Sequence, residues 1–142
     1  MIERTLSIVK PDAMRKGVAA EILRRLEASG LRIAAAKLVR INSQTAARFY
    51  VVHKDKNFYH SLTEFMASGP ILVSVWEGDN AIAKNREIMG DTDPARAEPG
   101  TIRRDFGSNV EQNAVHGSDA PDTARREIKF FFSALEIPAT WA

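Results

Sequence analysis

The sequence predicts an α+β fold (an α/β sandwich) of the ferredoxin-like βαββαβ type, with helices covering one face of a four-stranded antiparallel sheet. Segments of strand and helix periodicity follow in the order strand, helix, strand, helical pair, strand, helix, long loop, strand and helix. The chain has 142 residues, of which 44% are hydrophobic and 27% charged, as is typical of one globular domain. We therefore expect residues 1–142 to form a single domain with added helices.

The first elements are indicated by changes of period. The β-branched run at residues 5–9 predicts the first strand, and Pro11 should end it because proline has no N–H for a sheet. Apolar residues recur at helical spacing over residues 18–26, and Gly30 is typical of a helix end. Alternating apolar residues over 31–41 predict a second, half-buried strand.

A helical pair is expected next. Asn42 or Ser43 can cap its first helix, because either side chain can accept a backbone N–H, and this helix carries the apolar residues of 49–52. The second helix has an apolar stripe over residues 58–66, and the Gly-Pro pair at 69–70 should stop it.

The remaining elements begin with a buried strand. The nearly continuous apolar run at 71–76 is typical of a central strand, and a helix is expected from Asp79 towards Met89. Residues 90–112 have no clear period and form the long loop, which in a compact domain is usually functional or disordered. A short strand at 115–116 and a helix that begins at Pro121 complete the order.

The surroundings of His116 point to chemistry. This histidine ends a short apolar run, and residues 117–119 add a glycine, a hydroxyl and a carboxylate. Neutral histidine is a nucleophile near pH 7, and arginines such as Arg103 suit a transferring phosphoryl group. A lone histidine is more often simply packed or solvent-facing, so both interpretations stand at this point. His53 and His60 lie among polar helical residues and are expected at the surface.

Composition and missing motifs exclude several classes of function. The chain has no cysteine, which excludes disulfides, a thiolate nucleophile and a cysteine zinc site. It carries no Walker loop, dinucleotide fingerprint, protein-kinase motif or His-Glu-x-x-His zinc motif. The net charge is only +2, and basic and acidic residues are interspersed along the chain, which argues against a nucleic-acid partner. With neither a signal peptide nor a membrane span evident, a cytoplasmic location is expected.

Separated motifs along the chain carry a family resemblance. They are Thr-Leu-Ser-Ile-Val-Lys-Pro-Asp at 5–12, Ser-Gly-Pro at 68–70, Val-Trp-Glu-Gly at 75–78, Pro-Gly-Thr-Ile-Arg at 99–103, and Asn113 followed by His-Gly-Ser-Asp at 116–119. In these motifs, and in their order and spacing, the sequence resembles the nucleoside diphosphate kinase family of the bacterial type with a short carboxyl-terminal end. The resemblance covers essentially the full length.

The resemblance implies a phosphotransferase. Such an enzyme moves the γ-phosphoryl group of a nucleoside triphosphate to a nucleoside diphosphate by a ping-pong route through a phosphohistidine, and so maintains NTP and dNTP pools. Mg²⁺ is the implied cofactor, held through the nucleotide phosphates, so no residue of the chain is assigned as a metal ligand. Family members are usually tetramers or hexamers built from a common dimer, and the short tail favours neither assembly.

The resemblance also assigns roles to individual residues. His116 matches the nucleophile, Tyr50 a support beside it, Glu127 an acid that orients the imidazole, and Ser118 a neighbouring hydroxyl. Phe58 matches an aromatic that stacks on the base without reading its identity. The groups that match phosphate and ribose contacts are Lys10, Arg86, Thr92, Arg103 and Asn113, and Lys10 is also counted among the catalytic residues.

Some positions depart from the family pattern. Arg104 stands where glycine is usual, Asn57 where proline is common, and Asp93 where asparagine is frequent. Ala120 replaces a serine that often caps the last helix, which should cost about 1 kcal/mol unless Asp119 or Asp122 replaces the cap.

Two rival interpretations have different consequences. A catalytically idle nucleotide-binding regulatory module would bind nucleotides without being phosphorylated, but the chain retains His116 and the cations of its clamp. A basic ferredoxin-like nucleic-acid-binding domain would place exposed aromatic residues on its sheet, whereas the strands here carry mainly aliphatic side chains.

Overall fold

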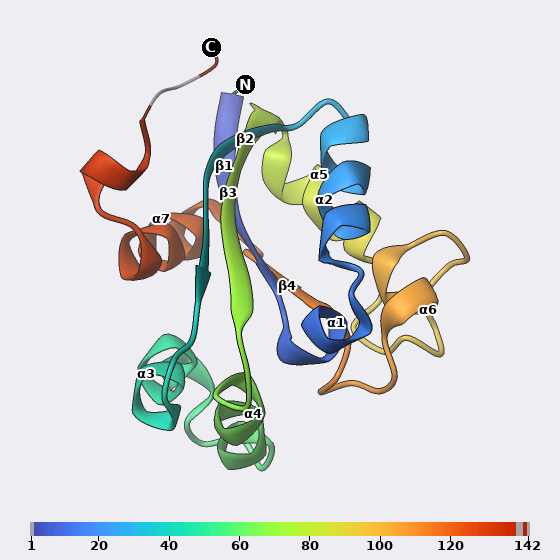
Figure 1. The fold of residues 1–142 in the computed structure, drawn as a ribbon, viewed down its shortest axis with the longest axis vertical. Coiled ribbons are helices and arrows are strands. Elements are labelled where there is room, and N and C mark those ends of the chain that lie inside the picture. Colours follow the sequence, from blue (N-terminus) through green and yellow to red (C-terminus); the bar gives the residue numbers. More distant parts are fainter. Residues whose placement is uncertain (1, 139–140, 142) are drawn as a thin grey trace.

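The computed structural model describes residues 2–138 and residue 141, and its centre is a four-stranded antiparallel sheet (Figure 1). The strands are β1 (Ile2–Val9), β2 (Arg32–Val39), β3 (Ile71–Asp79) and β4 (Val115–Gly117). They lie side by side in the order β2-β3-β1-β4. This arrangement confirms the ferredoxin-like prediction, and it puts the short strand that carries His116 at one edge, beside β1.

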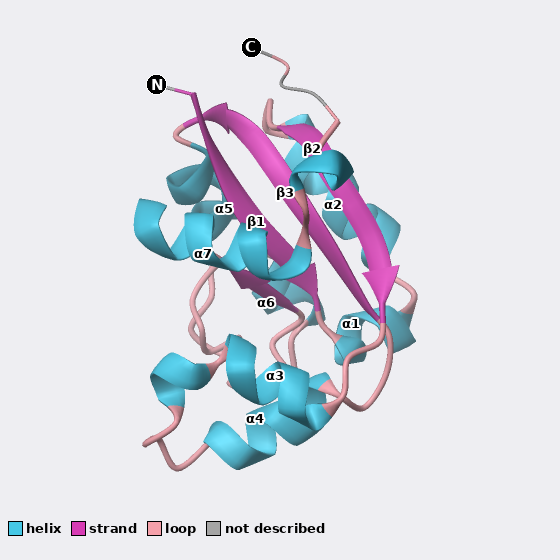
Figure 2. Cartoon of the chain, turned by 90° about the vertical axis from the view of Figure 1, so that its left-hand side faces the viewer, coloured by secondary structure: helices cyan, strands magenta, loops and turns pink. Residues whose placement is uncertain are grey.

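Helices connect and flank these strands. They are α1 (Pro11–Lys16), α2 (Ala19–Ala28), α3 (Ser43–Phe49), α4 (Tyr59–Met66), α5 (Ala81–Met89), α6 (Ile102–Phe106) and α7 (Pro121–Phe131), with 3-10 turns at Val51–His53 and Ala134–Glu136. Figure 2 shows α3 and α4 as a pair beyond one end of the sheet. No helix within the described ranges is long and apolar enough to cross a membrane.

Helices cover both faces of the sheet, so the expectation that they cover one face is wrong. Figure 1 shows α7 on one side and α2 with α5 on the other. Leu6 and Ile8 of β1 pack in a core cluster with Phe131 of α7, whereas Val9 packs in another with Ile22 of α2. Because successive strand residues point to opposite faces, a central strand that is apolar on both sides needs two helical layers.

Several element boundaries differ from the predicted ones. The first strand starts at Ile2, ahead of the predicted residue 5. Pro11 does more than end it, since it is the first residue of α1, where its missing N–H and fixed φ are tolerated. Asp79 ends β3 instead of opening α5, which begins at Ala81.

The helix caps agree with the sequence in part. Asn42 caps α3, because its Oδ1 accepts a hydrogen bond from Thr45 N at 2.8 Å. At α7, Ala120 is extended and supplies no side-chain cap. Neither alternative replaces it in the described residues: the carboxylate of Asp122 bonds Arg125, and Asp119 lies exposed beside the cavity described below.

The long connection before β4 is present, but it is partly ordered. It contains α6, which begins after Thr101, whose Oγ1 accepts from Arg104 N at 3.3 Å. Periodicity did not predict this helix because its 5 residues are too few to show a repeat. Through α6 the connection returns against the core, where Ile102 is buried with Val115 of β4.

Candidate active site

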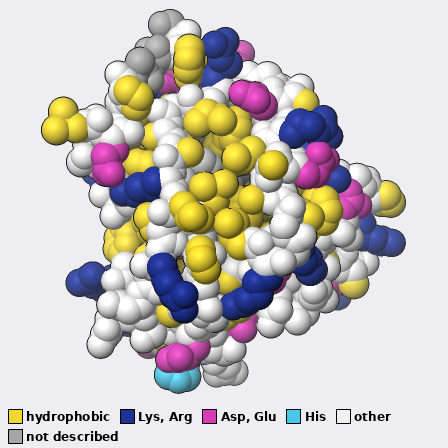
Figure 3. All heavy atoms as spheres, in the orientation of Figure 1, with side chains coloured by type: hydrophobic (Ala, Val, Ile, Leu, Met, Phe, Trp, Pro, Cys, Tyr) yellow, Lys and Arg dark blue, Asp and Glu magenta, His cyan; other side chains and the backbone are white. Residues whose placement is uncertain are grey.

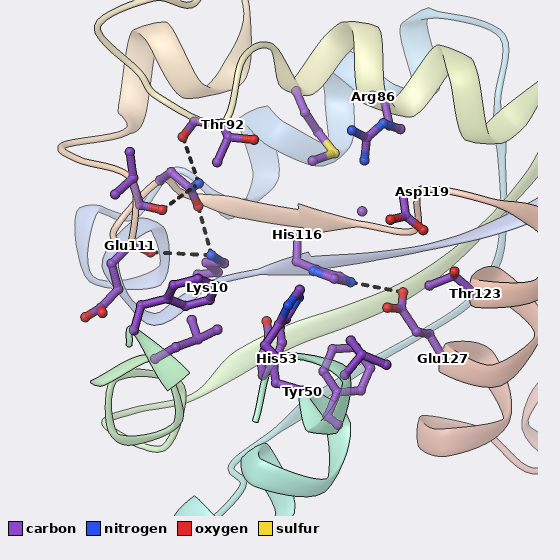
Figure 4. Close-up of a pocket in the computed structure, with 18 of the residues that line it drawn as sticks. Lys10, Tyr50, His53, Arg86, Thr92, Glu111, His116, Asp119, Thr123 and Glu127 are labelled. Atoms are coloured by element: carbon purple, nitrogen blue, oxygen red, sulfur yellow. Dashed lines mark hydrogen bonds and ion pairs between the residues drawn. The ribbon is translucent and has the colours of Figure 1, made fainter. Parts of the chain in front are cut away.

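A cavity of about 550 Å³ lies where the loops, α7 and the α3–α4 pair meet the edge strand β4. Its lining includes every candidate site residue except Ser118. These lining residues are Lys10, Tyr50, Phe58, Arg86, Thr92, Arg103, Asn113, His116 and Glu127. Residues more than 100 positions apart in the chain therefore meet at one place, and Figure 4 shows the imidazole of His116 between Lys10 and Glu127.

The imidazole of His116 is held on one of its nitrogens. Glu127, on α7, places its Oε1 at 3.0 Å from Nε2 of His116. The same oxygen accepts a hydrogen bond from Ser118 Oγ at 2.8 Å, and Ser118 Oγ accepts from Leu6 N at 3.2 Å. Ser118 is thus buried behind the cavity wall, where it orients the carboxylate. With a carboxylate at Nε2, the favoured tautomer carries its proton there and leaves the lone pair on Nδ1.

Lys10 is a buried cation aimed at the far side of the same cavity. Its Nζ donates to Asn113 Oδ1 at 2.8 Å and to Glu111 O at 3.4 Å. The amide of Asn113 in turn donates to Thr92 O at 3.0 Å, so backbone and side chains fix this corner. Burial, and then the nearby Arg103 charge, lower the pKa of Lys10 from 10.5 to about 8.

Two arginines add positive charge to the cavity. Arg103 is 8% exposed and donates to Val115 O at 2.9 Å and Gly90 O at 3.2 Å, which ties α6 to β4. Burial, followed by the charge of Arg86, lowers the pKa of Arg103 to about 10, so it stays protonated at neutral pH. Arg86 is exposed at the cavity. Arg104 instead donates to Ala97 O at 3.0 Å, and it does not line the cavity that the described residues form.

Aromatic rings enclose the histidine from α3 and the turn that follows. The ring of Phe49 lies 5.3 Å from that of His116, and the ring of Tyr50 lies 5.8 Å from it, both edge to face. Burial, with the Glu127 charge, raises the pKa of Tyr50, so the phenol stays neutral. Its buried hydroxyl has no hydrogen-bond partner among the described residues. This geometry agrees with a supporting position for Tyr50 beside the histidine.

The mouth of the cavity is aromatic and open. Phe58 is 47% exposed, so it is not a core residue, and its ring lies 5.6 Å from that of His53. His53 also stacks on Tyr50 at 6.3 Å and lines the cavity, so the expectation of an ordinary surface histidine is wrong. His60 is exposed, as expected. The helical period around His53 could not reveal its position, because the chain turns into a 3-10 helix there.

Sequence reasoning missed other residues of the cavity. Asp119 lines it from the segment before α7, Thr123 and Arg126 line it from α7 itself, and Glu111 lines it from the long connection. In the sequence, Asp119 stands out only as a carboxylate near His116 and as a possible cap, and Thr123 and Arg126 fall on a polar helix face that looks simply solvated. Only the spacing of Thr123 and Glu127, which lie one turn apart on α7, could have indicated that they share a face.

Comparison with known proteins decides the family of the chain. A family model described as nucleoside diphosphate kinase matches residues 3–137. The chain belongs to the nucleoside diphosphate kinase family. A nucleoside diphosphate kinase of Francisella philomiragia is 58% identical over 135 residues, which cover 95% of this chain and 96% of that protein. The chain therefore has nucleoside diphosphate kinase activity, and a kinase of Paracidovorax citrulli, another bacterial relative, is 56% identical over 138 residues, which cover 97% of this chain and 98% of that protein.

Solved structures of the nucleoside diphosphate kinase family agree with the fold. The kinase of Aquifex aeolicus has a TM-score of 0.95 at 46% identity, with 96% of this chain and 99% of that chain covered. A halophilic kinase from Halobacterium salinarum, solved in complex with CDP, has a TM-score of 0.94 at 41% identity, with coverages of 100% and 94%. The α+β architecture is thus common to the family, and the nucleic-acid-binding alternative is set aside.

Proposed function

We propose that His116 carries the phosphoryl group between nucleotides through its Nδ1 atom, in a ping-pong reaction that maintains NTP and dNTP pools. The supporting observation is the contact of Glu127 Oε1 with Nε2, at 3.0 Å. One nitrogen is occupied as a donor, so the other can act as a nucleophile without first losing a proton.

The proposed reaction has two symmetrical steps. Nδ1 attacks the γ-phosphorus of a nucleoside triphosphate, the bond from that phosphorus to the β–γ bridging oxygen breaks, and the nucleoside diphosphate leaves with the electron pair. A terminal oxygen of a second diphosphate then attacks the phosphorus, and the N–P bond breaks. The carboxylate of Glu127 stabilises the positive charge that develops on the ring, and the Nε2 proton stays in place throughout.

The cations of the cavity suit the transferring group. Charge in a phosphoryl transition state lies on the equatorial oxygens, and Lys10, Arg86 and Arg103 line the cavity where they can neutralise it. Lys10 and Arg103 are buried and held by hydrogen bonds, so little reorganisation is needed when phosphate arrives. The same clamp would serve donor and acceptor.

We assign the nucleoside part of the nucleotide to the open mouth of the cavity. The exposed ring of Phe58 offers a stacking surface, worth about 1–3 kcal/mol per base, that every base can use. Thr92 and Asn113 supply polar atoms for phosphate and ribose. The CDP complex of the Halobacterium salinarum relative supports nucleoside tri- and diphosphates as the partners of this cavity.

The cavity residues fit a Mg²⁺ ion that would be bound to the nucleotide phosphates. Among the described residues no group of three or more His, Cys, Asp or Glu side chains could hold a metal ion, whereas Asp119 and Thr123 line the cavity where they could bond water around a hydrated cation. Bound Mg²⁺ would add positive charge at the β- and γ-oxygens.

A homo-oligomer, tetramer or hexamer from a common dimer, is proposed from the side of the molecule on which the edge strand β2 lies. Among the described residues β2 pairs only with β3, so it is an edge strand. Figure 3 shows hydrophobic side chains gathered over the middle of this side, and Leu38 on β2 is 62% exposed. Light scattering after gel filtration should give a mass of at least twice the 15.8 kDa of one chain, and a monomer would contradict the proposal. The single domain and the cytoplasmic location stay predictions.

Intact mass under alkaline conditions tests the central proposal. After brief incubation with Mg-ATP the protein should gain one phosphate that acid removes and that added GDP takes away as GTP. His116→Ala should show no gain and no transfer, while it still binds nucleotide. Transfer at the wild-type rate by pure His116→Ala would sink the assignment, and nucleotide binding by the wild type with no phosphate gain would favour the regulatory module.

A further inference from the structure

Ala114 has an unusual backbone conformation close to the proposed nucleophile. Its φ is 73°, in the left-handed region that residues with a Cβ avoid, and it is 0% exposed. Val115 N donates across it to Asn113 O at 2.9 Å, which closes a three-residue γ-turn. With positive φ this is the rare and strained form of the turn, so surrounding contacts must hold it.

The contacts that hold this turn come from the segment after β1. Lys10 N donates to Ala114 O at 2.9 Å. On the amino side of the same residue, Asp12 Oδ2 accepts from Ala114 N at 3.0 Å, so the peptide units before and after Ala114 are both held. Lys10 Nζ donates to Asn113 Oδ1 at 2.8 Å, so a further hydrogen bond holds Asn113, the first residue of the turn.

Asp12 makes no other side-chain hydrogen bond among the described residues. It is 5% exposed, and it is not among the described residues that line the cavity. Its other oxygen, Oδ1, is buried without a hydrogen-bond partner among the described residues. The side-chain hydrogen bond to Ala114 spans 102 positions of sequence and does not serve α1, the helix in which Asp12 lies. Burying a carboxylate for one backbone N–H is unfavourable, which points to a function for that bond.

We propose that Asp12 is a positioning residue that holds Ala114 in its strained turn, and thereby sets Asn113 against Lys10 and fixes the start of the strand that carries His116. This role rests on the proposed function of His116 and its phosphate clamp. Without the acceptor at Asp12, Ala114 relaxes to negative φ, and the backbone on both sides of it rotates. Asn113 then leaves Lys10, and the imidazole shifts against Glu127.

A rescue experiment tests the proposal. Asp12→Ala removes the acceptor and should lower the single-turnover rate of enzyme phosphorylation by about 10- to 100-fold, the scale of a small misplacement of reacting groups. Asp12→Asn keeps a carbonyl acceptor and should stay within about fivefold of wild type. Ala114→Gly in the Asp12→Ala background should recover most of the lost rate, because glycine adopts positive φ without strain.

The readout separates positioning from folding. Rates are expressed per site that can be phosphorylated, counted by intact mass, so unfolded protein does not lower them. Asn42→Ala is the matched control: it also removes a side-chain oxygen from a backbone N–H, at Thr45, away from the cavity. It should lower the unfolding temperature and leave the rate per site unchanged.

Each other outcome overturns the proposal. A wild-type rate per site in Asp12→Ala would show that the contact positions nothing. Equal losses in Asp12→Asn and Asp12→Ala would assign the effect to charge, and no recovery on adding Ala114→Gly would remove strain as the cause. Failure of the proposed function looks different, because wild-type protein itself would then gain no phosphate.

Discussion

Glu127 Oε1 lies 3.0 Å from Nε2 of His116 and accepts a hydrogen bond from Ser118 Oγ at 2.8 Å. The carboxylate is 3% exposed, so its charge acts on the imidazole through little water. The arrangement makes Glu127 a group that acts on the ring and not on the nucleotide.

Glu127→Gln should separate charge from geometry. The amide oxygen can still accept from Nε2 and from Ser118, but the negative charge that stabilises a cationic ring is gone. A hydrogen bond to a charged group is worth about 1.5–3 kcal/mol, so the phosphorylation rate should fall about 10- to 100-fold. Rapid quench with Mg-ATP measures it.

Ser118→Ala is the control for that variant. It removes a neutral donor to the same oxygen, worth about 1 kcal/mol, and should slow phosphorylation only about fivefold. Glu127→Gln at the wild-type rate would contradict the role given to the charge.

Arg103 and Arg104 should differ sharply in their effect on transfer. Arg103→Ala removes a buried guanidinium from the cavity and should lower kcat/KM by about 100-fold or more. Arg104→Ala loses a bond to Ala97 O outside it and should change kcat/KM by less than about threefold. Thermal unfolding is recorded for both, because Arg103 also ties α6 to β4. Equal losses would mean that the wrong arginine has been placed at the phosphate.

The pH dependence of kcat/KM should have an alkaline limb from Lys10. Burial and Arg103 lower the pKa of Lys10 to about 8, while Asp12 and Glu111 act in the raising direction. As pH rises through this value the ammonium loses its proton, and kcat/KM for the triphosphate should fall. Bound phosphate favours the charged form, so the limb in kcat should lie at higher pH. A kcat/KM that stays flat up to pH 10 would exclude Lys10 as a charged phosphate ligand.

Ala120→Ser should stabilise the protein. Ala120 precedes α7 in an extended conformation and supplies no side-chain cap, and serine there can accept a backbone N–H of the first turn. The gain should be about 1 kcal/mol, or an unfolding temperature raised by about 3 °C. Ala120→Val, which adds bulk without an acceptor, is the matched control and should not give this rise in differential scanning fluorimetry.

Local chemistry made much of the fold predictable. Periodicity located the strands and the longer helices, Asn42 was correctly named as one of two caps, and Pro121 correctly begins α7. The short helices α1 and α6 could not be predicted, because a turn or so of helix has no period to detect. The second helical layer could not be predicted either, because a strand sequence that is apolar throughout does not show whether one or both of its faces are buried.

The order of the strands and longer helices, the family, and the residue types around His116 can all be read from the amino-acid sequence, because each depends on neighbours in the chain. That Lys10, Glu127 and His116 meet in one cavity, that His53 lines it while Arg104 does not, and that Asp12 reaches Ala114 became visible in the folded chain alone. The physical reason is the pairing of β1 with β4 at the edge of the sheet, which joins segments about 100 residues apart through backbone hydrogen bonds that carry no signal in the local sequence.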